Sequence, residues 1–365
     1  MPESTTPAQI PLWLDCDPGH DDACAMLLSI YHPALRILGI STVNGNAPLE
    51  NVTKNGLSVL EAIGATDVPL YKGAKEPFCR PVRSAAEVHG AGGLAGTDLL
   101  PEPTCEIQPG NTINAMRDAL LACPPKTAWL VAVGPLTNAA LLFAVYPEVA
   151  AHIKGISIMG GGIGDDFAPS VSLGPGYVDE KGKNRGRHGN YTAFAEFNFW
   201  ADIESARSVF LNPVLKPKTF LIPLDVSHQA YTTPKARDML LNGENGKTRL
   251  RVMFNELLEF VAGTYKDGWG MDTGAPLHDP LAVAILLADH PDSETRIDFN
   301  DNDGERWDID VVLGGEQEGR TVATKLQHGK PGVMIPRSLD TEKFWKVLES
   351  CMAKADEKTG FVKLS

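Results

Sequence analysis

Short apolar runs alternate with segments of helical periodicity along most of this chain, and that alternation limits the possible folds. Runs typical of buried strands occur at 11–16, 37–43, 127–133, 153–159 and 219–224. Helices are predicted at 21–31, 49–63, 111–122, 136–145, 202–211, 250–265, 280–288 and 341–353. Strands that alternate with helices form βαβ units. We therefore expect an α/β fold, a mostly parallel central sheet flanked by helices, with its active site at the carboxyl ends of the strands.

The chain shows no clear linker, so we expect one domain over residues 1–365. Residues 163–189 differ from the rest because they are rich in glycine, proline and charge, which predicts a loop insertion. The stretch 301–320 combines Asn, Asp and Gly between strand-like runs and predicts a turn in a β-hairpin.

The formal net charge of -13 argues against nucleic acid and anionic membranes as partners, because both attract lysine and arginine. The first ten residues lack the basic start and apolar run of a signal peptide. No stretch approaches the roughly 18 apolar residues of a membrane span. The 6 cysteines are dispersed, as expected for thiols in a reducing compartment. We expect a cytoplasmic protein.

Four carboxylates follow the first predicted strand, at the point where it passes into a helix. They are Asp15, Asp17, Asp21 and Asp22, on either side of a Pro-Gly turn. A helix cap and a solvated turn would explain one or two of them, but four like charges in one place are costly without a cation. Oxygen ligands with no nearby Cys or paired His favour a hard ion, Ca²⁺ or Mg²⁺.

The stretch LDCDPGHDDA at 14–23 resembles the aspartate-rich motif of the inosine–uridine-preferring nucleoside hydrolases. Further blocks match that family in order along the chain. They are TVNGN at 42–46, HGAGGL at 89–94, GPLTN at 134–138, MGG at 159–161, GNYT with AEFN at 189–198, and LHDPLA at 277–282. Each block lies beside a predicted strand end or helix start, so the resemblance implies the family's fold and a ribonucleoside as substrate.

Three departures from the family pattern stand out. Asp202-Ile203 replaces the usual Asp-Pro at a helix start, where Asp202 can still serve as the N-cap. Ala193 stands where the family often has Pro. The insertion is longer than in compact bacterial members of the family and lies just before a sugar-binding block. It could shape either the pocket or a contact between subunits.

The resemblance implies a Ca²⁺ site and a set of ribose ligands. The implied metal ligands are Asp17, Asp22, Asp279 and the backbone carbonyl of Thr137. Ca²⁺ would lower the pKa of a bound water, and Asp17 would act as the general base that takes its proton. Asp15 would orient these groups from behind. The implied ribose-binding residues are Asp21, Asn46, Asn190, Glu196 and Asn198. Asn198 lies on a strand-like apolar run, where an amide needs partners.

The leaving base needs a proton or stabilisation of its anion, and histidine suits this role near neutral pH. We favour His278 over His89 because it directly precedes Asp279, and His228 is a weaker candidate. His20 is more easily explained as structural. Tyr231 or Trp269 could pack against the base, although both could be ordinary core or surface residues.

Two other classes of protein compete with this interpretation. A nucleoside-binding protein without turnover would not need Asp17, Asp22 and Asp279, because binding requires no activated water. A D-x-D phosphatase would leave the later blocks unexplained.

We therefore expect Ca²⁺-dependent hydrolysis of ribonucleosides in salvage. Uridine is favoured through the LDVSHQ stretch at 224–229, and a purine-preferring or non-specific enzyme is the alternative. The family resemblance also implies a homodimer or homotetramer.

Overall fold

The computed structural model describes residues 9–164, 167–168, 171–178, 181–244 and 246–362. Its centre is a six-stranded sheet in the order β3-β2-β1-β4-β5-β8, and every neighbouring pair is parallel. The strands are β1 (Ile10–Cys16), β2 (Leu35–Thr42), β3 (Leu70–Lys72), β4 (Trp129–Ala132), β5 (Gly155–Met159) and β8 (Thr219–Ile222). This arrangement confirms the predicted α/β class.

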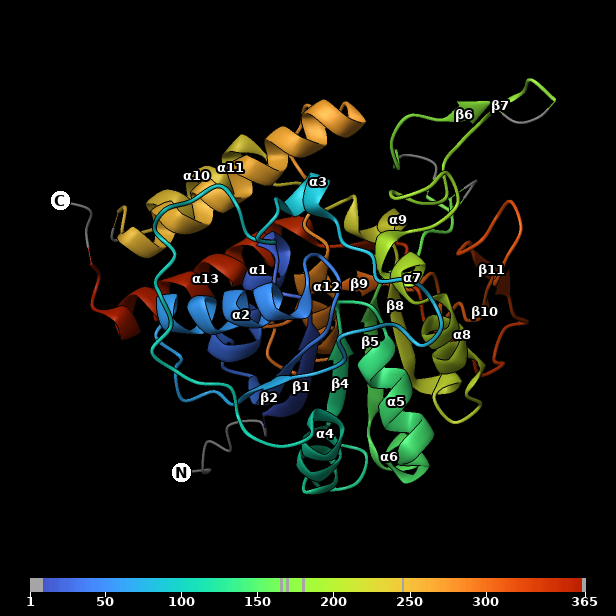
Figure 1. Ribbon diagram of the computed structural model, residues 1–365, viewed down its shortest axis with the longest axis horizontal. Coiled ribbons are helices and arrows are strands. Elements are labelled where there is room, and N and C mark those ends of the chain that lie inside the picture. The colour runs from blue at the N-terminus through green and yellow to red at the C-terminus, as the bar shows by residue number, and fades with distance from the viewer. Residues whose placement is uncertain (1–8, 165–166, 169–170, 179–180, 245, 363–365) are drawn as a thin grey trace.

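Helices flank this sheet in two groups (Figure 1). In one group α1 (His20–Tyr31) packs against α11 (Arg249–Trp269), α12 (Asp279–Ala284) and α13 (Thr341–Thr359). In the other, α5 (Thr137–Val145) packs against α4 (Thr112–Leu121), α6 (Pro147–His152) and α8 (Ile203–Leu211). The remaining helices are α2 (Leu49–Ala62), α3 (Ala86–His89), α7 (Phe197–Ala201), α9 (Leu224–Ser227), α10 (Pro234–Asn242), η1 (Lys216–Lys218) and η2 (Ile285–Leu287).

Burial explains why these segments form the core. All residues of β4 and β5 are buried, as expected for inner strands of a parallel sheet covered on both faces. The side chains of Leu12, Leu14 and Met26 are fully buried in the largest hydrophobic cluster. The chain's six cysteines are free thiols. Within the described ranges, no helix combines the length and apolar character needed to cross a membrane.

Among the described residues, three small two-stranded sheets lie outside the main sheet. β10 (Trp307–Val311) and β11 (Thr321–Lys325) form an antiparallel hairpin, which places a hairpin where the Asn/Asp/Gly-rich stretch suggested one. β9 (Phe299–Asn300) pairs with β12 (Ser338–Leu339). The insertion contains a short hairpin of β6 (Tyr177–Val178) and β7 (Asn184–Arg185), which stands out from the body (Figure 1).

One sequence expectation about local structure is wrong. The run around Asn198 is not strand-like, because it forms the short helix α7. The Glu196 side chain caps this helix by accepting hydrogen bonds from the backbone N–H groups of Asn198 and Phe199. By contrast, Asp202 is the N-cap of α8 as predicted, since its side chain accepts from the N–H of Ser205 at 3.1 Å.

Candidate active site

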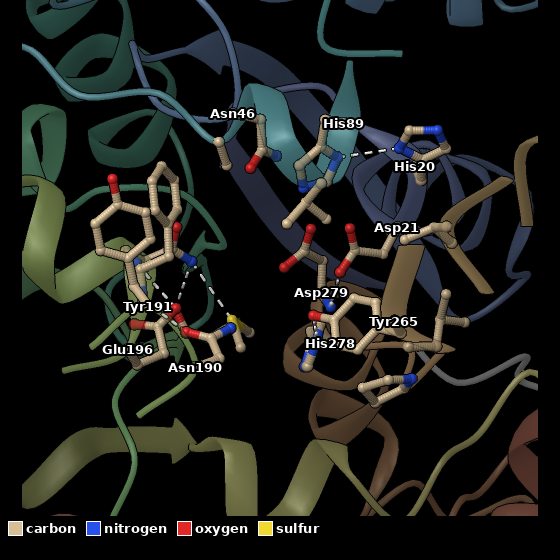
Figure 2. Close-up of a pocket in the computed structure, with 18 of the residues that line it drawn as sticks. His20, Asp21, Asn46, His89, Asn190, Tyr191, Glu196, Tyr265, His278 and Asp279 are labelled. Carbon is tan, nitrogen blue, oxygen red and sulfur yellow. Dashed lines mark hydrogen bonds between the residues drawn. The ribbon is translucent and has the colours of Figure 1, made fainter. Parts of the chain in front are cut away.

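A pocket lies where segments that follow β1, β2 and β5 meet the start of α12 (Figure 2). Its lining includes polar residues from widely separated parts of the sequence. They are His20, Asp21, Asn46, His89, Asn190, Glu196, Asn198, Tyr265, His278 and Asp279. The position matches the rule that parallel α/β sheets bind ligands at the carboxyl ends of their strands.

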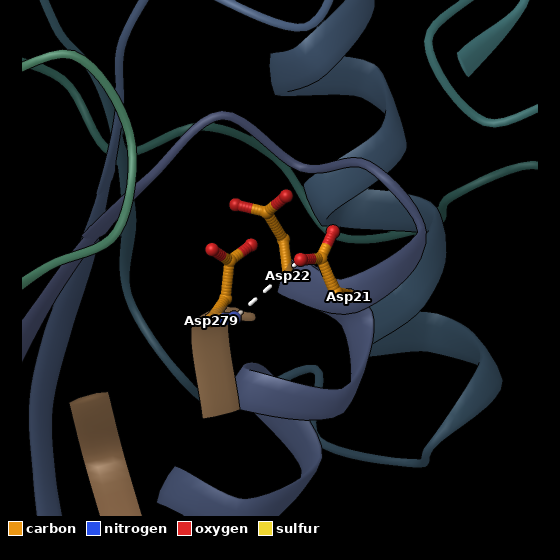
Figure 3. Close-up of side chains that lie close together, drawn as sticks. All are labelled: Asp21, Asp22 and Asp279. Carbon is orange, nitrogen blue, oxygen red and sulfur yellow. Dashed lines mark hydrogen bonds between the residues drawn. The ribbon is translucent and has the colours of Figure 1, made fainter. Parts of the chain in front are cut away.

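Three carboxylates converge beside this pocket. One oxygen from each of Asp21, Asp22 and Asp279 lies within 4.8 Å of the other two (Figure 3). The backbone N–H of Asp279 also donates to Asp21 Oδ2 at 3.4 Å, which holds the start of α12 against the start of α1. The sequence placed Asp22 and Asp279 in a metal site and Asp21 on the ribose, but the structure brings all three into one group.

Asp17 lies next to this group and is enclosed by backbone. Its Oδ2 accepts a hydrogen bond from the N–H of Asn46 at 2.7 Å, and its own N–H donates to Asp22 Oδ1 at 3.0 Å. A Cβ at Gly45 would stand 2.0 Å from Asp17 Oδ2, and one at Gly134 would stand 2.4 Å from Asp17 Oδ1. Only glycine at both positions therefore lets the loops after β2 and β4 approach this carboxylate.

Burial makes these carboxylates hard to ionise without a cation. Burial, reinforced by the charge of Asp21, raises the pKa of Asp22 to about 7. Burial and the charges of neighbouring aspartates likewise raise the pKa of Asp17 and of Asp279 well above the usual range. Among the described residues that line the pocket there is no Lys or Arg. A set of carboxylate oxygens without a protein countercharge fits a hard divalent cation.

The side chains of Thr137 and Asp15 are engaged elsewhere. The Thr137 hydroxyl donates to Asp202 Oδ2 at 2.6 Å, and its backbone carbonyl, the implied ligand, belongs to the first residue of α5. Asp15 Oδ1 accepts from Ser41 Oγ at 2.5 Å and from Asn138 Nδ2 at 2.8 Å. Burial raises the pKa of Asp15 to about 7, and its Oδ2 has no hydrogen-bond partner within the described part of the chain.

Protein contacts fix the amides expected to bind ribose. Asn46 Nδ2 donates to Asp22 Oδ2 at 3.1 Å and to the Asp17 carbonyl at 3.0 Å. Asn198 Nδ2 donates to the Val133 carbonyl at 2.8 Å. Each side chain therefore has its donor side engaged and its Oδ1 left to accept from a hydroxyl.

Glu196 and Asn190 occupy the opposite wall of the pocket (Figure 2). Both Glu196 oxygens cap backbone N–H groups, including that of Gly161 at 2.8 Å. Asn190 Oδ1 accepts from the N–H of Phe197 at 3.1 Å, so its Nδ2 is the side-chain atom left for other contacts. The sequence identified both residues but not that Glu196 also caps α7, because that role depends on a helix it did not predict.

His278 is buried with both ring nitrogens in contact with protein hydroxyls. Nδ1 lies 2.7 Å from Ser227 Oγ, and Nε2 lies 2.9 Å from the Tyr265 hydroxyl. Burial lowers the pKa of His278 to about 3, so the neutral ring is the form present in this arrangement. The sequence did not identify Tyr265, which comes from α11, and an aromatic residue on an amphipathic helix gives no signal of such a role.

One ring nitrogen of His89 has a hydrogen-bond partner in the protein, whereas both ring nitrogens of His278 do. His20 Nε2 lies 2.8 Å from the Ala95 carbonyl, which can only accept, so neutral His20 carries its proton there. His20 Nδ1 then accepts from His89 Nδ1 at 3.0 Å, and His89 Nε2 stays an acceptor. Burial lowers the pKa of His89 well below its usual value. His20 thus has a structural role, as expected, although it also borders the pocket.

The remaining candidates divide between the pocket and its surroundings. Trp269 lines the pocket and stacks on Tyr265 with ring centroids 5.0 Å apart. His228 lies behind His278, where its Nδ1 donates to the Ser172 carbonyl at 2.8 Å. Tyr231 pairs through its backbone with Pro276 and is not among the described residues that line the pocket.

Comparisons with known proteins identify a family and relatives of similar sequence. The model of the inosine-uridine preferring nucleoside hydrolase family matches residues 12–346. A uridine nucleosidase from Saccharomyces cerevisiae is 38% identical over 96% of this chain and 98% of its own. A pyrimidine-specific ribonucleoside hydrolase, RihA, from Klebsiella pneumoniae is 33% identical over 94% and 98%. Among solved structures, a purine-preferring ribonucleoside hydrolase from Gardnerella vaginalis has a similar fold, with a TM-score of 0.76, 22% identity and coverage of 94% and 98%.

Proposed function

The chain belongs to the family of inosine-uridine preferring nucleoside hydrolases and is an N-glycosyl hydrolase of ribonucleosides, and from this we propose that it prefers uridine and uses Ca²⁺. The preference for uridine is supported by the identity to the yeast uridine nucleosidase, which extends over nearly the full length of both chains. Identity to a pyrimidine-specific relative supports the same choice.

The observation that carries the proposal is the convergence of Asp21, Asp22 and Asp279, with Asp17 beside them, in a pocket without lysine or arginine among its described residues. Asp17, Asp22, Asp279 and the Thr137 carbonyl would hold the ion, and oxygen ligands of this kind suit Ca²⁺. The bound ion supplies a water of lowered pKa. Asp17 is the general base of the reaction, because backbone contacts fix its carboxylate beside the ligand group.

Ribose binds between the acidic group and the wall that carries Glu196. Asp21, Asn46, Asn190, Glu196 and Asn198 present carboxylate and amide atoms to vicinal hydroxyls, which need acceptors and donors at fixed positions. The positive charge that develops on the sugar in an oxocarbenium-like transition state is stabilised by the surrounding carboxylates.

The two histidines serve the leaving base in different ways. His89 offers Nε2 as an acceptor to an N–H group of the base, because its Nδ1 donates to His20. His278 acts through Tyr265, because that hydroxyl occupies its Nε2. We also propose that the enzyme works in nucleoside salvage as a homodimer or homotetramer, as the family resemblance implies, and in the cytoplasm, which the dispersed free thiols favour.

A substrate panel tests this function. Uridine, cytidine, inosine and adenosine are incubated with the purified protein and Ca²⁺, and free base is measured by chromatography. Uridine should give the highest kcat/KM, while a phosphate ester should release no phosphate. Faster hydrolysis of inosine would replace the proposed preference with a purine preference. Binding of uridine without release of uracil would identify a nucleoside-binding protein.

A further inference from the structure

The two ends of the 163–189 insertion lie side by side near the pocket and are joined by hydrogen bonds. Asp225 accepts hydrogen bonds from the N–H groups of Ile163 and Gly164, both at 2.8 Å. His188, at the other end, donates from Nδ1 to the Ile163 carbonyl at 2.7 Å. A Cβ at Gly162 would meet the His188 carbonyl oxygen at 1.9 Å, so the two ends touch through their backbones. The insertion therefore leaves and rejoins the domain at one place.

Arg187, at one of these ends, contacts the loop that carries Asn190. Its Nε donates to the Gly189 carbonyl at 2.9 Å, and its Nη2 donates to the Thr192 carbonyl at 2.8 Å and to the Asn190 carbonyl at 3.4 Å. One guanidinium thus contacts three backbone carbonyls within four residues of chain. The planar fork of arginine reaches these separated carbonyls from two nitrogen atoms, whereas the three donors of lysine radiate from one.

Trp269 contacts the same loop and the insertion. Its Nε1 donates to the Asn190 carbonyl at 3.3 Å, while its ring lies against Gly174 of the insertion. A Cβ at Gly174 would stand 3.0 Å from Trp269 Cδ1, and the backbone there has a φ of +112°. The backbone of Asn190 is therefore held between the insertion and the end of α11.

These contacts act on a residue whose side chain faces the pocket (Figure 2). With its carbonyl held by Arg187 and Trp269 and its Oδ1 bound to the N–H of Phe197, Asn190 has one orientation of its amide. Fixing a binding group before the substrate arrives lowers the cost of ordering it on binding.

We propose that Arg187 is a positioning residue for the sugar subsite, and that the insertion serves to place Asn190 against the ribose. This inference rests on the proposed role of Asn190 as a ribose-binding residue. It gives the insertion a function within the same chain, in contrast to a role limited to contacts between copies.

A double-mutant cycle on the full-length protein with Ca²⁺ tests this. Arg187→Lys, Asn190→Ala and the double variant are compared for kcat/KM on uridine, for inhibition by free ribose, and for Tm. Arg187→Lys should lower kcat/KM by roughly tenfold to a hundredfold, the range expected when a binding group is misplaced by about 1 Å. The double variant should be no worse than Asn190→Ala alone, because Arg187 acts through that residue. Arg185→Lys, at an exposed position on β7, is the matched control and should leave kcat/KM unchanged.

The outcomes separate this inference from the proposed function. If Asn190→Ala and Arg187→Lys lower kcat/KM by independent, additive amounts, Arg187 does not act through Asn190. Normal kcat/KM and normal ribose inhibition in Arg187→Lys would also overturn the positioning role, while leaving the hydrolase and the Asn190 assignment intact. Normal kcat/KM in Asn190→Ala would instead remove Asn190 from the ribose site, and the inference with it.

Discussion

The Asp17 carboxylate accepts a hydrogen bond from the backbone N–H of Asn46 at 2.7 Å, so the loops that follow β1 and β2 meet at one oxygen atom. The other oxygen faces Gly134 in the loop after β4. Three neighbouring strands of the sheet thus fix the position of the carboxylate that we propose as the general base.

Replacing Asp17 should abolish most turnover. In Asp17→Asn the side chain keeps its size and can still accept from Asn46, but it cannot take a proton from water. We expect kcat for uridine to fall by about 10²–10⁴-fold, the usual contribution of a general base. Uracil release measures this, with Tm as a check on folding. A kcat within a factor of a few of the natural protein would exclude Asp17 as the base.

A methyl group at Gly134 should displace the same carboxylate. The Cβ of Gly134→Ala would stand 2.4 Å from Asp17 Oδ1, so the side chain must move. We expect kcat/KM to fall by about a hundredfold, as for a shift of about 1 Å in a catalytic group. Gly263→Ala in α11 is the control, because nothing lies within 4 Å of its Cβ and alanine stabilises a helix by about 1 kcal/mol. Equal kcat/KM in both variants would contradict the close approach.

Removal of divalent metal should inactivate the enzyme, and Ca²⁺ should restore it. Ion binding to the folded state alone also raises stability, by about 2.7 kcal/mol at a concentration 100 times Kd. Thermal unfolding with and without Ca²⁺ therefore gives a measurement independent of activity. Asp22→Asn should lose the Ca²⁺-dependent rise in Tm. An enzyme that keeps full activity in chelator would require a different account of Asp21, Asp22 and Asp279.

His278 should matter more for the leaving base than for the sugar. We expect His278→Ala to lower kcat for uridine by about 10²–10⁴-fold with a smaller change in KM. A riboside with p-nitrophenolate as leaving group needs no proton on departure, so its hydrolysis should fall less. His89→Ala should weaken binding of the base instead, because its Nε2 can accept but not donate a hydrogen bond. Equal losses on both substrates would place His278 in sugar binding, and an unchanged kcat would remove it from the mechanism.

A buried ion pair outside the pocket provides a test of stability that does not involve the active site. Arg251 and Asp356 are fully buried, with Nε 2.5 Å from Oδ2, and Thr248 also donates to Asp356 at 2.6 Å. Asp356→Ala removes the buried partner of Nε but leaves Glu349 at 3.0 Å from Nη2, so the free energy of unfolding should fall by about 1–3 kcal/mol, the cost of an unsatisfied buried donor. Denaturant unfolding measures this. Since neither residue is among those described as lining the pocket, KM for uridine should not change.

The sequence predicted the main elements of the fold because their patterns are local. The buried run that became β1 and the periodic segment that became α1 are found within one or two residues of their predicted bounds. Helix α7 was missed because the alternation of Phe197, Asn198 and Phe199 is typical of a strand. The deciding interaction is the capping by Glu196, which a pattern of apolar residues does not reveal.

The site was predicted in part for a similar reason. Residues that follow strands, such as Asp22 and Asn46, were expected at the carboxyl edge and are found there. The engagement of His278 by Tyr265 could not be predicted, because it depends on where α11 packs. The placement of Asn190 depends on Arg187 in the insertion, a segment without the periodicity from which the other elements were predicted.

The acidic group joins Asp21 to Asp279 across 258 positions of sequence. A polypeptide that ends before Asp279 would lack one of the three converging carboxylates, and we expect it to have no hydrolytic activity. For the same reason, neither half of the gene alone would encode an active enzyme.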